Sequence, residues 1–228
     1  MHSVVFVGTM DADAAPAVSD LFARFDASDL PHLAGVRKRQ MYTYHDLHIN
    51  VVDFGREPDD AQIEVLKTDP RVVTHQQKLN ALVAPLRPDS WRGAADSAAT
   101  PFYLWQQRGW KDTAAGSTHS TIVVNRMDQS ARPEVAALFA GLDATDFPYR
   151  MGTHRRQLFT HHGVYFHIQD FPEQNGKAVI AEAWKEKDPR FIEICRELDP
   201  HMTVYDPGTW RSTADQIATR FYHWEAAA

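Results

Sequence analysis

The chain has 228 residues, of which 43% are hydrophobic and 24% are charged, a composition that allows a real core and excludes wholesale disorder. The net charge of −6 argues against a general nucleic-acid or anionic-membrane surface, because both need a basic patch, and no apolar run approaches the ~20 residues of a spanning helix. A single cysteine and no apparent signal peptide favour a reducing, cytoplasmic location.

The predicted elements alternate between strands and helices. A β-branched run at 4–7 predicts a strand, and Pro16 opens an amphipathic helix that must end before Pro31. Strands are expected at 37–45 and 48–54, helices at 61–66 and 71–83, and a closing aromatic strand at 102–105.

The same order then recurs, because the chain is an internal duplication. Residues 10–54 match residues 127–171 without a gap at an offset of 117, and later blocks match at an offset of 119. We therefore predict two domains, 1–106 and 120–228, joined by a linker of glycines and small polar residues at 107–119.

The element order β-α-β-β-α-β in each repeat is the ferredoxin-like plan, so the fold class is predicted to be α+β. Such a sheet has helices on one face and must cover the other. Two copies laid sheet to sheet would do so and would form an internal pseudo-dimer of the dimeric α+β barrel type.

The central hairpin separates a polar face from an apolar one. With Asp46-Leu47 as the turn, Thr43 pairs with Asn50 and the apolar face suits packing under helices. That apolar face carries Tyr42, Tyr44, Ile49 and Val51, and the polar face carries Arg39, Met41, Thr43, His45, His48 and Asn50. With Gly163-Val164 as the second turn, the polar face carries Arg156, Leu158, Thr160, His162, Tyr165, His167 and Gln169. This half-apolar composition fits a small-molecule cavity, and the alternative is a solvated sheet face.

Three motifs in each repeat resemble those of the tetracenomycin-type aromatic polyketide cyclases. The first repeat has F-D-A-S-D-L-P at 25–31, G-V-R-K-R at 35–39 and Y-H-D-L at 44–47. The second has L-D-A-T-D-F-P, G-T-H-R-R and H-G-V-Y-F-H in the same order. The resemblance covers nearly all of both repeats.

The resemblance implies a cofactor-free enzyme. Its reaction would be a regiospecific intramolecular aldol cyclisation of a poly-β-ketone-derived intermediate, followed by dehydration and aromatisation. The implied partners are that intermediate, free or carrier-bound, and type II polyketide synthase components. Family members are single-domain dimers, so the fused tandem implies an internal dimer that is monomeric as a chain.

The resemblance also assigns roles to matched residues. Arg39 and Arg156 match the last arginine of the basic run and could polarise a substrate carbonyl, the alternative being an ion pair across the sheet. Asp26 and Asp143 could orient these arginines or act as bases, or they could be simple helix-end carboxylates. Arg37, in the same basic run, is assigned to substrate binding.

The histidines differ between the repeats. His45 and His162 match the hairpin histidine of the family, suited to proton transfer or to a turn-side hydrogen bond. His167 matches the family's strand-borne histidine, but the first repeat has Asn50 in its place. Our hypothesis is that the second repeat holds the better-equipped pocket, while the first is mainly a structural partner or binds another part of the substrate. The expected substrate contacts are Tyr165, Gln169, Thr160, His48, Asn50, Thr43 and Arg37.

Other chemistries receive less support. The histidines of 154–167 lack ligand spacing, so no metal site is predicted, and Cys195 reads as an apolar residue of a helix rather than a nucleophile. Two alternatives stay open. One is a cofactor-independent oxygenase on the same fold, and the other is a non-catalytic polyketide-binding partner of a synthase complex.

Overall fold

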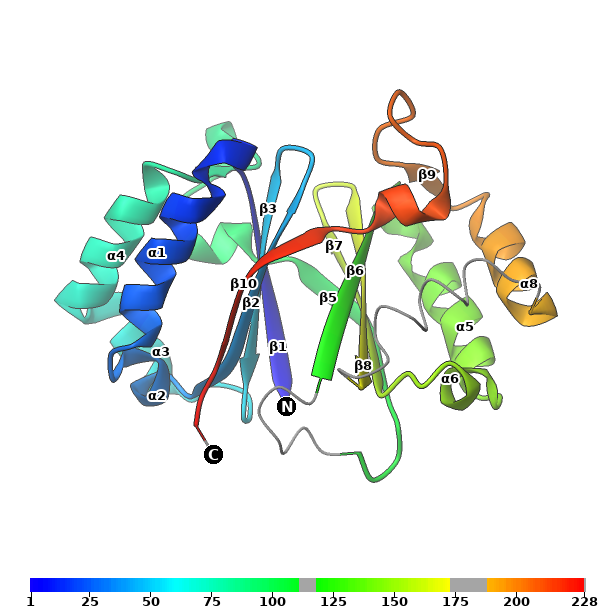
Figure 1. Cartoon of the computed structure of the whole chain (residues 1–228), viewed down its shortest axis with the longest axis horizontal. Helices are drawn as coiled ribbons and strands as arrows, with labels where there is room; N and C mark the ends of the chain where they lie inside the picture. Colours follow the sequence, from blue (N-terminus) through cyan, green and yellow to red (C-terminus); the bar gives the residue numbers. More distant parts are fainter. Residues whose placement is uncertain (111–117, 173–187, 228) are drawn as a thin grey trace. The chain divides into compact units, whose positions relative to one another are not determined.

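The computed structural model describes residues 1–110, 118–172 and 188–227, which form two compact units (Figure 1). The N-terminal unit consists of residues 1–99 and 219–227, and the C-terminal unit of residues 100–218. None of the helices in these described ranges is long and apolar enough to cross a membrane.

The N-terminal unit is one antiparallel sheet with helices on one face. Its strands run in the order β10-β2-β3-β1-β4. Their bounds are β1 His2–Thr9, β2 Val36–Tyr44, β3 Leu47–Phe54, β4 Ala84–Pro85 and β10 Thr219–Glu225. The helices are α1 Ala15–Asp26, α2 Leu30–Leu33, α3 Asp60–Thr68 and α4 Pro70–Asn80.

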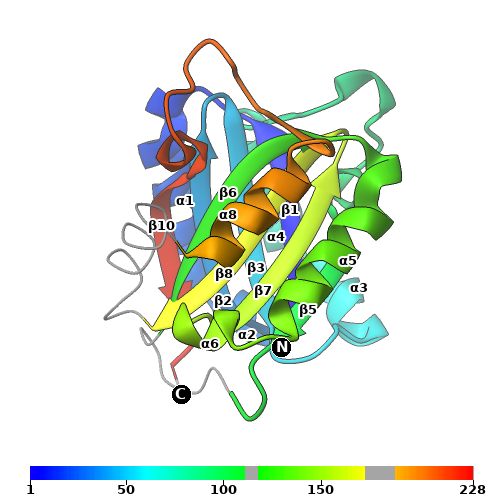
Figure 2. The same cartoon turned by 90° about the vertical axis from the view of Figure 1, so that its right-hand side faces the viewer.

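The C-terminal unit repeats this plan, with strand order β5-β7-β8-β6-β9. The strands are β5 Thr100–Gln106, β6 Thr118–Met127, β7 Arg155–His161, β8 Val164–Pro172 and β9 Met202–Val204. The helices are α5 Arg132–Asp143, α6 Phe147–Arg150 and α8 Pro189–Leu198. Figure 2 shows α5 and α8 lying across one face of this sheet. These two units confirm the predicted α+β, ferredoxin-like fold class.

The closing strands are exchanged between the repeats, which corrects the pairing expected from sequence. Strands β4-β1-β3-β2 already have the ferredoxin-like order, with the two-residue β4 as the fourth strand. The fifth strand, β10, comes from the second repeat and pairs with β2, while β5 of the first repeat pairs with β7. An open edge at β2 or β7 exposes unpaired backbone groups, and a long strand from the other repeat satisfies them.

The compact units therefore do not coincide with the sequence repeats. Residues 111–117 of the predicted linker lie outside the described residues, and β6 begins at Thr118, within the predicted linker range.

The central hairpins turn one residue earlier than predicted, at His45-Asp46 and His162-Gly163. His45 and His162 adopt left-handed φ angles of 52° and 48°, as the first position of a tight hairpin turn requires. Leu47 is fully buried, so it belongs to the strand rather than to the turn. Thr43 consequently pairs with His48, two residues from the predicted register. A shift of two leaves each side chain on its predicted face.

The helices cover the polar face, not the apolar one as expected. Met41 packs with Val18 and Phe22 of α1, and in the C-terminal unit Leu158 and Tyr165 pack with Phe139 of α5. The apolar residues Tyr42, Tyr44, Ile49 and Val51 are buried on the opposite face. The polar residues can lie under the helices because they bind charged partners there, as described below.

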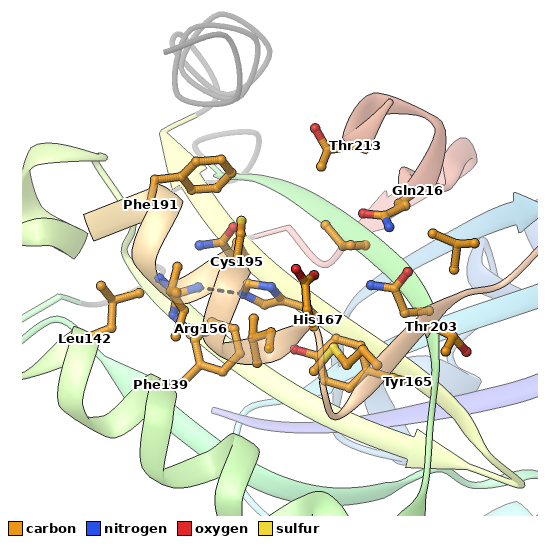
Figure 3. Close-up of a pocket in the computed structure, with 18 of the residues that line it drawn as sticks. Phe139, Leu142, Arg156, Tyr165, His167, Phe191, Cys195, Thr203, Thr213 and Gln216 are labelled. Carbon is orange, nitrogen blue, oxygen red and sulfur yellow. Dashed lines mark hydrogen bonds between the residues drawn. The ribbon is translucent and has the colours of Figure 1, made fainter. Parts of the chain in front are cut away.

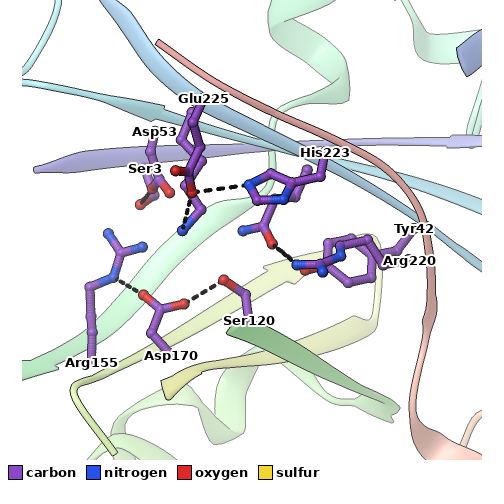
Figure 4. A network of polar contacts seen from close by, with 11 residues as sticks. Ser3, Tyr42, Asp53, Ser120, Arg155, Asp170, Arg220, His223 and Glu225 are labelled. Atoms are coloured by element: carbon purple, nitrogen blue, oxygen red, sulfur yellow. Dashed lines mark hydrogen bonds and ion pairs between the residues drawn. The ribbon is translucent and has the colours of Figure 1, made fainter. Parts of the chain in front are cut away.

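The opposite face also carries buried charges. In the C-terminal unit the Arg155 guanidinium donates to Asp170, which also accepts a hydrogen bond from the Ser120 hydroxyl at 2.6 Å (Figure 4). The N-terminal unit repeats the serine–aspartate pair as Ser3–Asp53. Each of these pairs joins strands of one sheet.

Candidate functional site

A cavity of about 290 Å³ lies in the C-terminal unit between the sheet and helices α5 and α8 (Figure 3). Its walls are mainly apolar, with side chains such as Phe139, Leu142, Phe147, Phe191, Ile194 and Leu198. The polar side chains that the sheet contributes are Asn125, Arg156, Tyr165, His167 and Gln169, and the remaining polar lining residues include Asp199, Thr203, Thr213 and Gln216. An apolar enclosure with a few converging polar groups is typical of a small-molecule site.

Arg156 at the wall of this cavity forms an ion pair with Asp143, which is not itself among the lining residues. Asp143 ends α5, where the helix dipole disfavours a carboxylate, and Arg156 on β7 supplies the compensating charge. The guanidinium Nε donates to both carboxylate oxygens at 3.1 and 3.0 Å, and the two side chains are only 2% and 1% exposed. Tyr103 of β5 donates its hydroxyl to Asp143 at 2.9 Å.

The pKa values of Asp143 and Tyr103 are both raised by burial, but their charged neighbours act on them in different directions. Burial raises the pKa of Asp143, although Arg156 and the hydrogen bond from Tyr103 act in the opposite direction. Burial and the neighbouring carboxylate raise the pKa of Tyr103, which therefore remains a hydroxyl donor. Asp143 thus binds and orients Arg156 from the end of a helix, whereas the ion pair expected as the arginine's alternative role was one across the sheet.

His167 extends this pair toward the cavity. Nη1 of Arg156 lies 2.7 Å from Nε2 of His167. A guanidinium can only donate, so Nε2 is the acceptor and the neutral ring carries its proton on Nδ1. Burial, reinforced by the charge of Arg156, holds the pKa of His167 well below its usual value.

Gln169 binds both terminal nitrogens of the Arg156 guanidinium. With its amide oxygen facing Arg156, it accepts from Nη1 at 2.8 Å and from Nη2 at 3.1 Å. Both terminal nitrogens of Arg156 therefore have partners inside the unit.

Two polar atoms at this cavity have no hydrogen-bond partner among the described residues. They are the hydroxyl of Tyr165 and the amide oxygen Oδ1 of Asn125. Burial raises the pKa of Tyr165, so this group stays a neutral donor. Cys195 also lines the cavity, and burial raises the pKa of its thiol, as expected for an unreactive cysteine.

The N-terminal unit holds a related cavity of about 210 Å³ between its sheet and helices α1, α3 and α4. Arg39 Nε donates to both oxygens of Asp26 at 3.2 and 2.9 Å, and Tyr222 of β10 donates to Asp26 at 3.0 Å. The guanidinium carbon lies 4.7 Å from the ring centre of Phe22 and 5.7 Å from that of Phe25. The aspartate, arginine and tyrosine are therefore duplicated.

The acceptors that bind the terminal nitrogens of Arg156 are not repeated around Arg39. Asn50 and Val52 stand where the C-terminal unit has His167 and Gln169. Neither Nη of Arg39 has a hydrogen-bond partner within the described ranges.

Two histidines line this cavity instead. Burial lowers the pKa of His48 to about 4, and burial together with Arg39 and Lys78 lowers that of His75 to about 4. The Nε2 atoms of both histidines lack partners among the described residues. His75, on α4 against Phe22 and Phe25, was missed by the sequence analysis. Its counterpart at an offset of 119 is Ile194, so comparing the repeats would have marked it.

Seven residues predicted for the site lie outside both cavities, and two of them, Asp26 and Asp143, bind the arginines at the cavity walls. His45 and His162 are exposed in the hairpin turns, because the turns come one residue earlier than expected. Arg37 is exposed, Thr43 pairs with Thr219 in the sheet, and Thr160 donates its hydroxyl to the carbonyl of Val164. The predicted residues that do meet are Arg156, Tyr165, His167 and Gln169 in one cavity, and Arg39, His48 and Asn50 in the other, with Asp143 bound to Arg156 and Asp26 bound to Arg39.

Within the part of the chain that the structure describes, no three His, Cys, Asp or Glu side chains are placed to hold a metal ion.

Comparison with solved structures supports the fold. A Lactobacillus acidophilus protein of proposed monooxygenase activity matches 99% of this chain and 97% of its own with a TM-score of 0.56 and 8% identity. An anthrone oxidase-like protein matches 99% of this chain and 93% of its own with a TM-score of 0.53 and 9% identity. At these identities the likeness concerns the fold alone.

Comparison of sequences identifies the family. A protein of Streptomyces coelicolor without a described function is 35% identical over 108 residues, which are 47% of this chain and 95% of the relative. A polyketide synthase protein, CurG, of Streptomyces cyaneus is 33% identical over 47% of this chain and 97% of its own. The tetracenomycin F2 cyclase of Streptomyces glaucescens is 29% identical over 47% of this chain and 95% of its own. The family model described as polyketide synthesis cyclase matches residues 2–106 and again 119–225, so the chain belongs to the polyketide synthesis cyclase family, with two copies in tandem.

Proposed function

We propose that the protein is a cofactor-free enzyme that closes a ring in a poly-β-ketone-derived intermediate by intramolecular aldol addition and then removes water. The chemistry is assigned to the cavity of the C-terminal unit. The observation that carries this proposal is the hydrogen-bonded series Tyr103–Asp143–Arg156–His167, which ends at the wall of an apolar cavity.

Ring closure begins with removal of a proton from a carbon between two carbonyls. Nη1 of Arg156 turns from Nε2 of His167 to a substrate carbonyl oxygen, and the freed Nε2 takes the proton. The depressed pKa makes this histidine a weak base toward water, so transfer occurs as enolate charge develops beside the guanidinium.

The carbanion then attacks a ketone carbon further along the folded substrate. The resulting alkoxide takes back the proton from Nε2 of His167. In the dehydration, Nε2 of His167 removes the remaining proton of the attacking carbon, the carbon–oxygen bond breaks, and the leaving hydroxide takes that proton and departs as water, while the hydroxyl of Tyr165 donates a hydrogen bond to it. Asp143 fixes the position of the Arg156 guanidinium and forms no bond to the substrate. The apolar walls fix one folded shape of the chain, which determines the ring that closes.

The substrate, free or carrier-bound, is proposed to come from a type II polyketide synthase. The cavity of about 290 Å³ is near the lower end of the about 300–1,000 Å³ typical of ligand sites, so it suits the reacting segment of such a chain.

The test is to add the protein to a minimal polyketide synthase and to compare the ring pattern of the products. We expect the shunt products to be replaced by one cyclised product, and an unchanged profile would remove the cyclase assignment. His167→Ala should abolish the change, whereas the matched variant Asn50→Ala should reduce it less. Equal losses would contradict the placement of the chemistry in the C-terminal unit.

A further inference from the structure

The cavity of the N-terminal unit contains a buried arginine whose terminal nitrogens have no partner among the described residues. Arg39 is 6% exposed, and its Nε is fixed by Asp26, so the fork formed by Nη1 and Nη2 is held in place at the cavity wall. Unpaired donors on a buried cation are costly, and most such groups in proteins bind an acceptor.

The equivalent guanidinium in the C-terminal unit, that of Arg156, shows which acceptors Arg39 lacks. Gln169 accepts from both Nη atoms of Arg156 through one amide oxygen, and His167 accepts from Nη1. With Val52 and Asn50 at these positions, neither residue forms a hydrogen bond to Arg39, while the arginine and its aspartate remain. The Nη atoms of this guanidinium are then open to an acceptor on a ligand.

The geometry of a guanidinium fork selects the ligand's polar group. Two parallel N–H groups match two coplanar oxygens of an anion, as in a carboxylate or the enolate of a 1,3-diketone. Around the fork the cavity is apolar and aromatic, with Phe22, Phe25, Leu79 and Val83 among its walls.

Further polar atoms surround this fork. Nε2 of His48, Nε2 of His75 and Oδ1 of Asn50 are buried and unpaired within the described ranges. Both rings and the amide line the same cavity as Arg39, so they can bind hydroxyl groups on the ligand.

We propose that the N-terminal cavity is a second, non-equivalent binding site for an aromatic-sized apolar molecule that carries a planar pair of anionic oxygens, bound bidentately by Nη1 and Nη2 of Arg39. The proposal does not depend on where, or whether, ring closure occurs, because it concerns a different cavity and a binding measurement.

Isothermal titration calorimetry of the full chain tests this with three probes. 2-Naphthoate presents a carboxylate, benzoylacetone presents an enolisable 1,3-diketone, and 2-naphthamide is the neutral control. We expect one equivalent of 2-naphthoate to bind, with benzoylacetone binding above its enol pKa and the amide at least tenfold more weakly. Binding of benzoylacetone alone would identify the enolate as the ligand type, and binding of neither anion would overturn the proposal.

Two matched variants locate the site. Asn50→His/Val52→Gln copies the C-terminal partners onto Arg39 and should weaken 2-naphthoate binding at least tenfold. The converse variant, His167→Asn/Gln169→Val, opens the fork of Arg156 and should raise the stoichiometry from one to two. The second variant needs no change in the N-terminal unit, so it remains informative if the first fails to fold. Unchanged affinity in a folded first variant, or unchanged stoichiometry in a folded second one, would contradict recognition by the fork.

Discussion

The buried pair of Asp143 and Arg156 allows a quantitative prediction for Asp143→Asn. Both side chains are almost completely buried, so removing the charge leaves the guanidinium without its counterion. Deleting one partner of a buried ion pair costs about 3–5 kcal/mol of unfolding free energy. Asparagine keeps one acceptor oxygen, and a hydrogen bond contributes about 1–1.5 kcal/mol. We therefore expect a loss of about 1.5–4 kcal/mol for Asp143→Asn, and of about 3–5 kcal/mol for Asp143→Leu, which keeps no acceptor.

Urea unfolding at pH 7, followed by circular dichroism, measures these losses. Asp26→Asn is the matched control in the N-terminal unit, where the same three bonds are present, and should give a similar loss. The double variant Asp143→Leu/Arg156→Met should recover most of the stability, because apolar replacement of a whole buried pair is often neutral, yet it should not recover ring closure. A loss below about 1 kcal/mol for Asp143→Asn, or a double variant as unstable as Asp143→Leu, would refute the reasoning.

Three further predictions concern single groups. Because the pKa of His48 is lowered to about 4 in the folded state, protonation favours unfolding, and stability should fall between pH 6.5 and 4 by about 1.4 kcal/mol per pH unit for this histidine. His48→Tyr, which copies Tyr165, should reduce that slope in thermal or urea unfolding, and an unchanged slope would exclude His48 as its source. Tyr103→Phe and Tyr222→Phe each remove one bond to a buried carboxylate and should each cost about 1–2 kcal/mol in urea unfolding; a cost for only one of them would show that the two pairs are not equivalent. Burial raises the pKa of the Cys195 thiol, so it should react with iodoacetamide at pH 7.5 more slowly than N-acetylcysteine does. Because Cys195 lines the cavity of the C-terminal unit, 2-naphthol bound there should slow the reaction further. Faster alkylation than that of the free thiol would contradict the burial of Cys195.

Which side chains share a face of the sheet was predictable from sequence, because along a strand it depends only on whether two residues are an even number of positions apart. Arg156, Tyr165, His167 and Gln169 keep their common face although the register moved by two residues. The position of the turn was not predictable in this way, because His162 adopts a left-handed conformation that short polar residues and glycine usually supply.

Two other features depend on contacts distant in sequence. The aromatic pattern of β5 is that of a strand whichever sheet it joins, so the exchange with β10 leaves no local signal. His75 lies in a polar helical stretch, and only its position against Phe22 and Phe25 shows that it belongs to a cavity. The local sequence pattern was therefore enough to predict the strands and which side chains share a face. The pairing of the edge strands and the site residues on helices could be found only from the three-dimensional structure.

The exchange of closing strands also bears on how the two cavities can change over generations. Tyr103 of the first repeat donates to Asp143, and Tyr222 of the second repeat donates to Asp26, so the ion pair at each cavity depends on one residue from the other half of the gene. In a homodimer of one repeat, every substitution would appear in both cavities at once. Fusion of the repeats into one chain frees each position to mutate in one cavity while the other keeps its inherited residue. The duplicated gene could thus retain His167 at one arginine and acquire Asn50 at the other, within a protein whose halves each still depend on a strand supplied by the other.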